Sequence, residues 1–361
     1  MITDFISIFK NNNILLYIIP SIICLISFGD YIKEKKIKKY ILIIICLILV
    51  FITTTRSTSL NIFYGHDTNS YINFFNNLGR GDTSKFEIGY VAINIIIKFF
   101  TNNYRYVFCV MSLMTMYFLY KYIRYYTDNE FICILAYVCI FYYLRDIGQM
   151  RAALAYSICI YSTIYLIEEK NKKFLIYILL ATTIHFSSIF MLTLYPMYKL
   201  KLSRKSLTIL LIISLVLFGF EWLDFIRDIA YNLPENKYTI SLINYTSNSR
   251  ARGIDSKVML YMLISIVGIY IKDNDNIKSP KYDINIYSLV LGMFIAGVFN
   301  GSEVISVRLS ELFITSIIVV ISRFKDIADN DRLEVIYHVF TCLFFIVYNF
   351  FLISSLTEYG L

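Results

Sequence analysis

Residues 40–55 read YILIIICLILVFITTT, an apolar run that contains no charged residue. A transmembrane helix needs about 20 mostly apolar residues, and Lys38, Lys39 and Arg56 supply the flanking charges expected near the two membrane surfaces. Similar apolar blocks recur along the chain, at 14–28, 107–122, 131–144, 152–167, 206–222, 258–271, 284–299, 309–322 and 335–353. The pattern predicts an all-α polytopic membrane protein with about ten to twelve transmembrane helices.

The composition excludes a soluble protein of this length. Of the 361 residues, 58% are hydrophobic and 17% are charged, whereas about 25% of the residues of soluble domains are charged. The net charge of +8 is ordinary for a membrane protein and does not indicate nucleic acid as a partner. The three histidines are scattered, and the seven cysteines form no Cys-x-x-Cys pair. No Gly-rich nucleotide fingerprint is present. We therefore predict no metal and no cofactor.

Loop charge predicts which segments share a side of the membrane, because short loops rich in Lys and Arg stay in the cytoplasm. The basic segments are 33–39, 121–128, 168–173, 199–205, 272–281 and 323–332. The segments predicted on the outer side are 56–87, 145–151, 223–256 and 300–307. On this topology the chain is a single transmembrane domain, 1–361, with a first outer loop over 56–105 and a second over 223–256.

Two stretches must deviate from simple spans for this topology to hold. The run Ile88–Phe100 is short and contains Asn94 and Lys98, so we expect a helix that lies in the outer interface. The run 174–198 lies between two basic loops and has polar residues around His185 at its middle. It is either one span that breaks the charge rule or, as we favour, two short helices that meet near His185. Broken helices are tolerated where they line a protein or water-filled cavity.

A cationic cluster is predicted at the outer junction between two spans. Arg145 and Arg151 are six residues apart, and Gln149 lies between them, beside the start of the next helix. Guanidinium groups and the free N–H groups of a helix start suit a diphosphate. The alternative is an ion pair with Asp146, or anchoring to lipid headgroups. Arg308, at the outer end of another span, is either a snorkelling anchor or a further anion ligand.

Two carboxylates and a histidine are the candidates for proton transfer. Asp67 in the first outer loop and Glu87 before the interfacial helix would place carboxylates over the membrane mouth. Each could act as a general base on a sugar hydroxyl or could cap a helix. His185 is either a structural residue or part of one cavity with Arg151. In the second outer loop, Arg252 belongs to a basic tip that either meets an anionic glycan or is solvated.

The order of these features resembles a known family. The motifs, in chain order, are Asp67-x-x-x-Tyr71, Phe86-Glu87-x-Gly89-Tyr90, Asn102-Asn103-Tyr104, Arg145-x-x-Gly148-Gln149-x-Arg151-x-x-Leu154-Ala155 and His185-Phe186-Ser187-Ser188. The series covers most of the chain and resembles the EpsG family of bacterial exopolysaccharide proteins, which belongs with the Wzy-type O-antigen and capsule polymerases. Similar proteins carry Ile-Arg-Gln at the second arginine, whereas here Gln149 precedes Arg151 by two residues.

The resemblance implies a polysaccharide polymerase, a glycosyltransferase of GT-C-like membrane architecture that needs no nucleotide sugar. It would transfer the growing glycan from undecaprenyl diphosphate to a lipid-linked repeat unit, at the periplasmic or outer face of the bacterial inner membrane. The implied partners are the undecaprenyl-diphosphate-linked oligosaccharide and the membrane, with a chain-length regulator protein as a further candidate.

On this mechanism the residues divide into two groups. The leaving diphosphate would be stabilised by Arg145, Arg151 and Arg308, with Gln149 and His185 in support. The proton of the acceptor hydroxyl would be taken by Asp67 as first candidate, Glu87 as second and His185 as third. Two other classes fit the same residues: a flippase or transporter of the lipid-linked oligosaccharide, and another lipid-linked sugar transferase.

Overall fold

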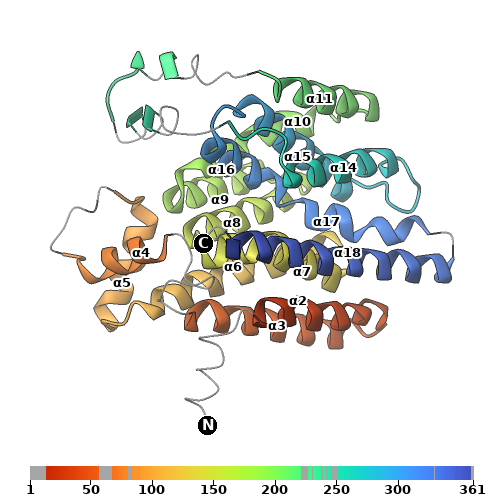
Figure 1. Cartoon of the computed structure of the whole chain (residues 1–361), viewed down its shortest axis with the longest axis horizontal. Coiled ribbons are helices and arrows are strands. Elements are labelled where there is room, and N and C mark those ends of the chain that lie inside the picture. The colour runs from red at the N-terminus through yellow and green to blue at the C-terminus, as the bar shows by residue number, and fades with distance from the viewer. Residues whose placement is uncertain are drawn as a thin grey trace, which may run out of the picture. The chain divides into compact units, whose positions relative to one another are not determined.

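The computed structural model describes residues 14–56, 67–79, 83, 85–220, 227–229, 231–236, 239–240, 243–244, 251–328 and 330–358, and within these it contains helices and no strand (Figure 1). Of the helices in the described residues, four are long and apolar enough to cross a membrane: α3 (Lys35–Thr55), α6 (Arg105–Tyr126), α8 (Met150–Ile167) and α18 (Asp331–Glu358). A fifth span results if the pair formed by α16 (Glu303–Ile314) and the segment Ile317–Ile327, bent by 45°, is counted as one. The prediction of a polytopic α-helical membrane protein is confirmed. The number of ten to twelve spans stays a prediction, as do the GT-C-like architecture and the interfacial position of Ile88–Phe100.

The chain divides into two compact units. Unit 1 comprises residues 1–161, 179–186 and 321–361, and unit 2 comprises residues 162–178 and 187–320. The single domain expected over 1–361 stays a prediction. Of the two expected outer loops, residues 57–66 of the first and most of 223–250 in the second lie outside the described residues.

The remaining elements are shorter. In unit 1 they are α2 (Ile14–Ser27), η1 (Phe28–Tyr31), α4 (Thr68–Asn76), α5 (Ile88–Phe100), α7 (Glu130–Tyr137), η2 (Val138–Ile147) and η4 (Phe324–Ile327). The helix α9 (Asn171–Ile184) runs from unit 2 into unit 1, and it is followed by η3 (Phe186–Thr193). Unit 2 further contains α10 (Leu194–Lys199), α11 (Arg204–Leu217), α14 (Ser256–Ile271) and α15 (Pro280–Val298), while α17 (Ile317–Ser322) ends in unit 1.

Side-chain caps begin several helices of unit 2. The oxygen of each capping side chain accepts a hydrogen bond from the backbone N–H three residues later, which satisfies one of the unpaired donors of a helix start. The capping residues are Ser203 for α11, Asp255 for α14, Ser279 for α15 and Ser302 for α16. These caps explain why the helices begin where short polar segments meet the apolar blocks.

The basic segments of unit 1 meet at one end of its helices. Lys38 Nζ donates to the backbone oxygens of Asp30 (2.7 Å) and Asp128 (3.1 Å), and Asn129 Nδ2 donates to the backbone oxygen of Ser322 (2.7 Å). Asn129 Nδ2 also donates to Asp326 Oδ1 at 3.0 Å. The contacts therefore join the loop at 33–39 to the loop at 121–128, and the residue after the second loop to the segment 323–332; the charge rule predicts all three on one side of the membrane.

The segments predicted on the outer side meet at the other end. Arg105 Nη1 donates to the backbone oxygen of Thr54 at 3.0 Å, and Arg56 Nη1 donates to the backbone oxygen of Asp146 at 3.1 Å. The grouping of loops within unit 1 therefore agrees with the sidedness that the charges predict. Which end faces the cytoplasm stays a prediction.

Helix α5 has the bounds expected from the sequence, Ile88–Phe100. Its polar side chains turn towards the protein: Asn94 Nδ2 donates to the backbone oxygen of Tyr90 at 2.8 Å, and Lys98 Nζ donates to that of Phe75 at 3.2 Å. The opposite face presents Phe99 and Phe100. The donor groups of both polar side chains therefore find backbone acceptors within unit 1.

The run around His185 is broken, as favoured from the sequence. Helix α9 ends at Ile184, His185 lies in neither helix, and the 3₁₀ helix η3 begins at Phe186. The last turn of α9 packs closely on α5, because a Cβ at Gly89 would lie 2.8 Å from the backbone oxygen of Thr183. Glycine is thus required for α5 to reach the helix break.

We expect Gly89→Ala to destabilise the protein by about 1–3 kcal/mol, because the added methyl group must push α5 away from backbone atoms that cannot yield. Thermal unfolding of the purified protein in detergent measures the change. Ile96→Ala, an exposed change on the same helix, is the control and should shift the unfolding temperature little. Equal stability of Gly89→Ala and the wild type would contradict the close contact with α9.

Candidate functional site

The site is built on the junction between η2 and α8. The π-helical turns of η2 end at Ile147, and Gly148 connects them to α8, which begins at Met150. A Cβ at Gly148 would collide with the backbone oxygen of Leu144, so this tight connection needs glycine. π-Helical turns are rare and frequently occur at functional sites. Arg145 lies before the junction and Arg151 after it.

An ion pair connects Arg151 to the segment before α5. Arg151 Nη1 donates to Glu87 Oε2 at 2.5 Å, and the two side chains are 17% and 14% exposed. The other oxygen, Glu87 Oε1, accepts the backbone N–H of Phe186 at 3.3 Å. Glu87 therefore ties the start of α8 to the break that follows α9.

Aromatic rings surround the guanidinium of Arg151. Its Cζ lies 4.6 Å from the ring centroid of Phe86, 5.6 Å from that of Tyr90 and 5.8 Å from that of Tyr71. Burial raises the pKa of Tyr71 to about 12, so its phenol stays neutral at physiological pH. Neutral rings keep water away from the guanidinium and so lower the local dielectric constant. The interaction of the guanidinium with an anion is then stronger than it would be in water.

Arg145 makes a second cationic position on the same junction. Its side chain is buried, its Nη1 donates to Gln149 Oε1 at 2.9 Å, and its Cζ lies 5.0 Å from the ring centroid of Tyr156. The Tyr156 ring lies 5.9 Å from that of His185. Gln149 thus orients Arg145, and His185 belongs to the same side-chain cluster.

Asp67 joins the cluster through its backbone. Its N–H donates to the backbone oxygen of Gly148 at 3.2 Å, which fixes the start of α4 to the junction. Although Asp67 occupies the N-cap position of α4, its carboxylate caps no backbone N–H; Oδ2 accepts the hydroxyl of Tyr71 at 3.3 Å instead. The capping role that the sequence offered as an alternative is not the one observed.

Arg56 is a residue that the sequence analysis missed as part of the site. Its guanidinium lies 4.1 Å from the ring centroid of Phe108 and donates to the backbone oxygen of Asp146 and to Thr68 Oγ1 (3.2 Å). Burial lowers the pKa of Arg56 to about 10, so it remains charged at neutral pH. An arginine at the end of an apolar block is an ordinary interfacial anchor, so nothing in the local sequence distinguished it.

The other two arginines selected from the sequence belong to unit 2. Arg308 is half-buried on α16. Arg252 does not form an exposed tip: its side chain is 1% exposed, its Nη1 donates to Ser306 Oγ and Ser310 Oγ (3.3 Å each), and its Nε faces Asp255 Oδ2 at 3.4 Å. Arg252 thus connects its loop to α16, and its role in ligand binding stays a prediction, as does that of Arg308.

The structure brings together six of the eight residues selected from the sequence. Unit 1 unites Asp67, Glu87, Arg145, Gln149, Arg151 and His185 at one junction. Among the described residues, no three His, Cys, Asp or Glu side chains lie close enough to hold a metal ion. The junction thus carries two guanidinium groups, which are chemically suited to an anion such as a phosphate, together with the carboxylates of Asp67 and Glu87.

Either single change at the pair, Arg151→Gln or Glu87→Gln, should destabilise the protein by about 3 kcal/mol, since each leaves one charge poorly solvated. The double variant should lose less stability than the sum of the losses of the two single variants, because neither charge remains without its partner. Chemical unfolding in detergent gives the coupling energy by a double-mutant cycle.

The matched control is the pair of Arg124 and Glu130, which lies at the basic end of unit 1 with Arg124 30% exposed. More exposed pairs contribute little, so its coupling energy should be smaller. Strict additivity at Arg151 and Glu87 would contradict the buried pair.

Comparison with known proteins matches residues 39–360 to the family model described as the EpsG family. No curated protein and no solved structure matches the chain.

Proposed function

The chain belongs to the EpsG family, which is associated with exopolysaccharide biosynthesis, and on that premise we propose that it is a polysaccharide polymerase. It transfers the growing glycan from undecaprenyl diphosphate to a lipid-linked repeat unit at the outer face of the bacterial inner membrane. The resemblance of its motifs to Wzy-type polymerases supports this activity.

The observation that carries the proposal is the pair of arginines around the start of α8. Arg145 and Arg151 lie on one junction, both largely shielded from water, and the start of α8 beside them has the positive end of its helix dipole there. A lipid diphosphate carries charge on two adjacent phosphates, so two guanidinium groups match it better than a single anchor would. In a site poor in water, such fixed cations lower the barrier for departure of an anionic group.

The reaction needs one bond to form and one to break. The oxygen of the acceptor hydroxyl attacks the anomeric carbon of the donor glycan, and the bond between that carbon and the diphosphate oxygen breaks. The bonding electrons leave with the diphosphate, where Arg145 and Arg151 stabilise them. The proton of the hydroxyl passes to a base of the protein. Because the lipid diphosphate is the leaving group of the donor, no nucleotide sugar is consumed.

Asp67 is the best-placed base. Its carboxylate is partly exposed and accepts the Tyr71 hydroxyl through one oxygen, which leaves it acceptor capacity for a substrate hydroxyl. Glu87 already accepts donors through both oxygens, so it acts as a positioning residue for Arg151. His185, held against Tyr156, supports the cationic side of the site.

The decisive experiment incubates the purified protein in detergent with a polyprenyl-diphosphate-linked repeat unit, without nucleotide sugar or metal. The products are resolved as a ladder on a gel. We expect a ladder with the wild type and at least a roughly hundredfold slower reaction with Arg151→Lys, which keeps the charge but loses the planar fork that holds two oxygens. Arg124→Lys, at the other end of unit 1, should react as the wild type does.

If no ladder forms but the lipid-linked unit crosses the membrane of reconstituted vesicles, the protein is a transporter and the polymerase proposal fails. Normal polymerisation by a folded Arg151→Lys protein would remove the diphosphate site from the scheme.

Replacing the base tests the other half of the mechanism. Asp67→Asn should slow polymerisation by roughly 10²–10⁴-fold, the usual contribution of a general base, and should leave the unfolding temperature almost unchanged because the side chain is partly exposed. Initial rates at saturating substrate measure the effect. A rate within a factor of about two of the wild type would instead assign the proton to another group.

A further inference from the structure

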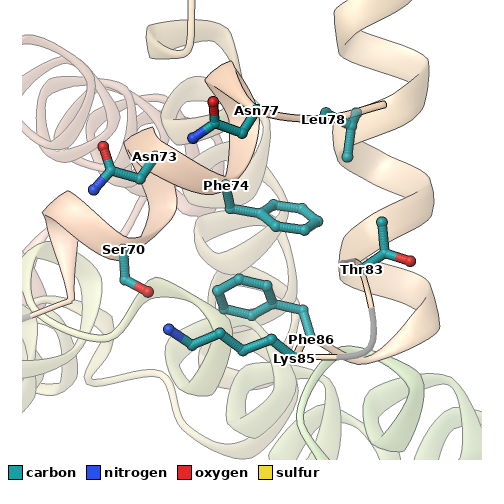
Figure 2. A pocket seen from close by; sticks show the side chains of 8 residues that line it. All are labelled: Ser70, Asn73, Phe74, Asn77, Leu78, Thr83, Lys85 and Phe86. Carbon is teal, nitrogen blue, oxygen red and sulfur yellow. The ribbon is translucent and has the colours of Figure 1, made fainter. Parts of the chain in front are cut away.

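A small cavity lies between α4 and the segment that leads into α5 (Figure 2). Its volume is about 250 Å³, and its lining includes Ser70, Asn73, Phe74, Asn77, Thr83 and Phe86. Ligand pockets usually measure roughly 300–1,000 Å³, so this cavity has room for a single ring rather than for an extended chain. Of its lining residues, Phe86 is the one described above as part of the cationic cluster, through the contact of its ring with Arg151.

Two aromatic rings form the apolar wall of the cavity. Phe74 and Phe86 meet edge to face, with centroids 4.5 Å apart and an angle of 64° between the ring planes. Figure 2 shows both rings turned into the cavity, from α4 and from the segment before α5. Phe86 is only 6% exposed, so its ring is held in place and supports the ring of Phe74, which is half-buried. The open part of a supported aromatic ring is a platform for the C–H face of a sugar ring, which is flat and apolar on that side.

Hydroxyl and amide groups complete the lining. Asn73 lies on α4 and Asn77, one turn later, is the C-cap residue of that helix, and Figure 2 shows both amides on the same side of the rings. Ser70 and Thr83 add hydroxyl groups. Amides and hydroxyls both donate and accept hydrogen bonds, as the hydroxyls of a sugar do. Lys85 also lines the cavity, and its Nζ lies 5.9 Å from the ring centroid of Phe86. An aromatic wall with amides, hydroxyls and this one ammonium group distinguishes the cavity from the cluster of arginines.

The cavity adjoins both functional parts of the site. Phe86 forms its wall and also lies 4.6 Å from Cζ of Arg151. Asp67 is the N-cap of α4, and Ser70 and Phe74 follow it along the same side of that helix at one-turn intervals. A ring in the cavity would therefore lie along the same side of α4 as the candidate base, which precedes the lining residue Ser70 by one turn, and would be separated from Arg151 by the Phe86 ring.

We propose that this cavity is the subsite for one sugar residue of the acceptor repeat unit. The sugar packs on Phe74 and Phe86 and hydrogen-bonds to the amides of Asn73 and Asn77. This assignment rests on the proposed polymerase function, because it is the acceptor whose hydroxyl must reach Asp67.

Binding can be measured without catalysis, which separates the subsite from the polymerase activity. The probe is the lipid-free repeat unit, prepared by partial hydrolysis of the polysaccharide made by cells that express this chain, and saturation-transfer NMR in detergent measures its affinity. We expect Phe74→Ala to weaken binding by about tenfold. Asn73→Ala with Asn77→Ala should weaken it to a similar degree, and because both residues are exposed, this variant keeps the packing of unit 1.

The controls locate the effect. Phe99→Ala removes a ring from the exposed aromatic pair on α5, whose centroids lie 5.2 Å apart, and it should leave binding unchanged. Arg151→Lys should bind the lipid-free glycan normally even though it loses polymerisation. No measurable binding to the wild type, or equal binding to the folded Phe74 and Asn73/Asn77 variants, would overturn the subsite even if the ladder forms.

Kinetics distinguish an acceptor sugar from a donor sugar. With a preformed multi-unit lipid-linked chain as donor, Phe74→Ala should raise the KM for the single repeat unit by about tenfold and leave kcat nearly unchanged. A rise in the KM for the long donor instead would assign the cavity to the donor glycan and overturn the acceptor assignment.

Discussion

The ion pair between Arg151 and Glu87 is the constraint on which the rest of the site depends. It joins two positions 64 residues apart in sequence, and through the second oxygen of Glu87 it also reaches the backbone of Phe186. A shielded pair contributes little net stability, but breaking it leaves a poorly solvated charge. The start of α8, the entry to α5 and the break after α9 are therefore fixed relative to one another by one carboxylate.

The surroundings of this pair determine what it can do. Rings of Phe86, Tyr90 and Tyr71 screen the guanidinium from water, while Arg145 and Arg56 place two further cations on the same end of unit 1. Cations held by packing and by neutral partners need no reorganisation when an anion arrives. In the proposed reaction, a lipid diphosphate would bind to guanidinium donors that do not pair with Glu87, and the surrounding rings would hold those donors in position.

The sequence predicted the elements that local patterns control. The bounds of Ile88–Phe100 follow from an apolar run flanked by polar residues, and the break at His185 follows from polar residues inside an apolar block. Pairings between distant segments have no local signal. Glu87 was selected as a carboxylate, but its partner Arg151 could not be inferred. Arg252, which reads as an exposed basic tip, is instead buried against Ser306 and Ser310, because burial of a long side chain depends on what packs over it.

The proposed arrangement separates the chemistry of the reaction from the choice of sugar. Phe86 is shared by the cationic cluster and the cavity, and it is buried, so a change there would disturb both. Asn73 and Asn77 are exposed, and they line the cavity without belonging to the cationic cluster. They can therefore be replaced at little cost in stability. A polymerase must keep one way of releasing a diphosphate while accepting a particular repeat unit. An inner wall that cannot vary and an outer rim that can is a physical means of meeting both demands, and it places the determinants of acceptor specificity on the exposed face of α4.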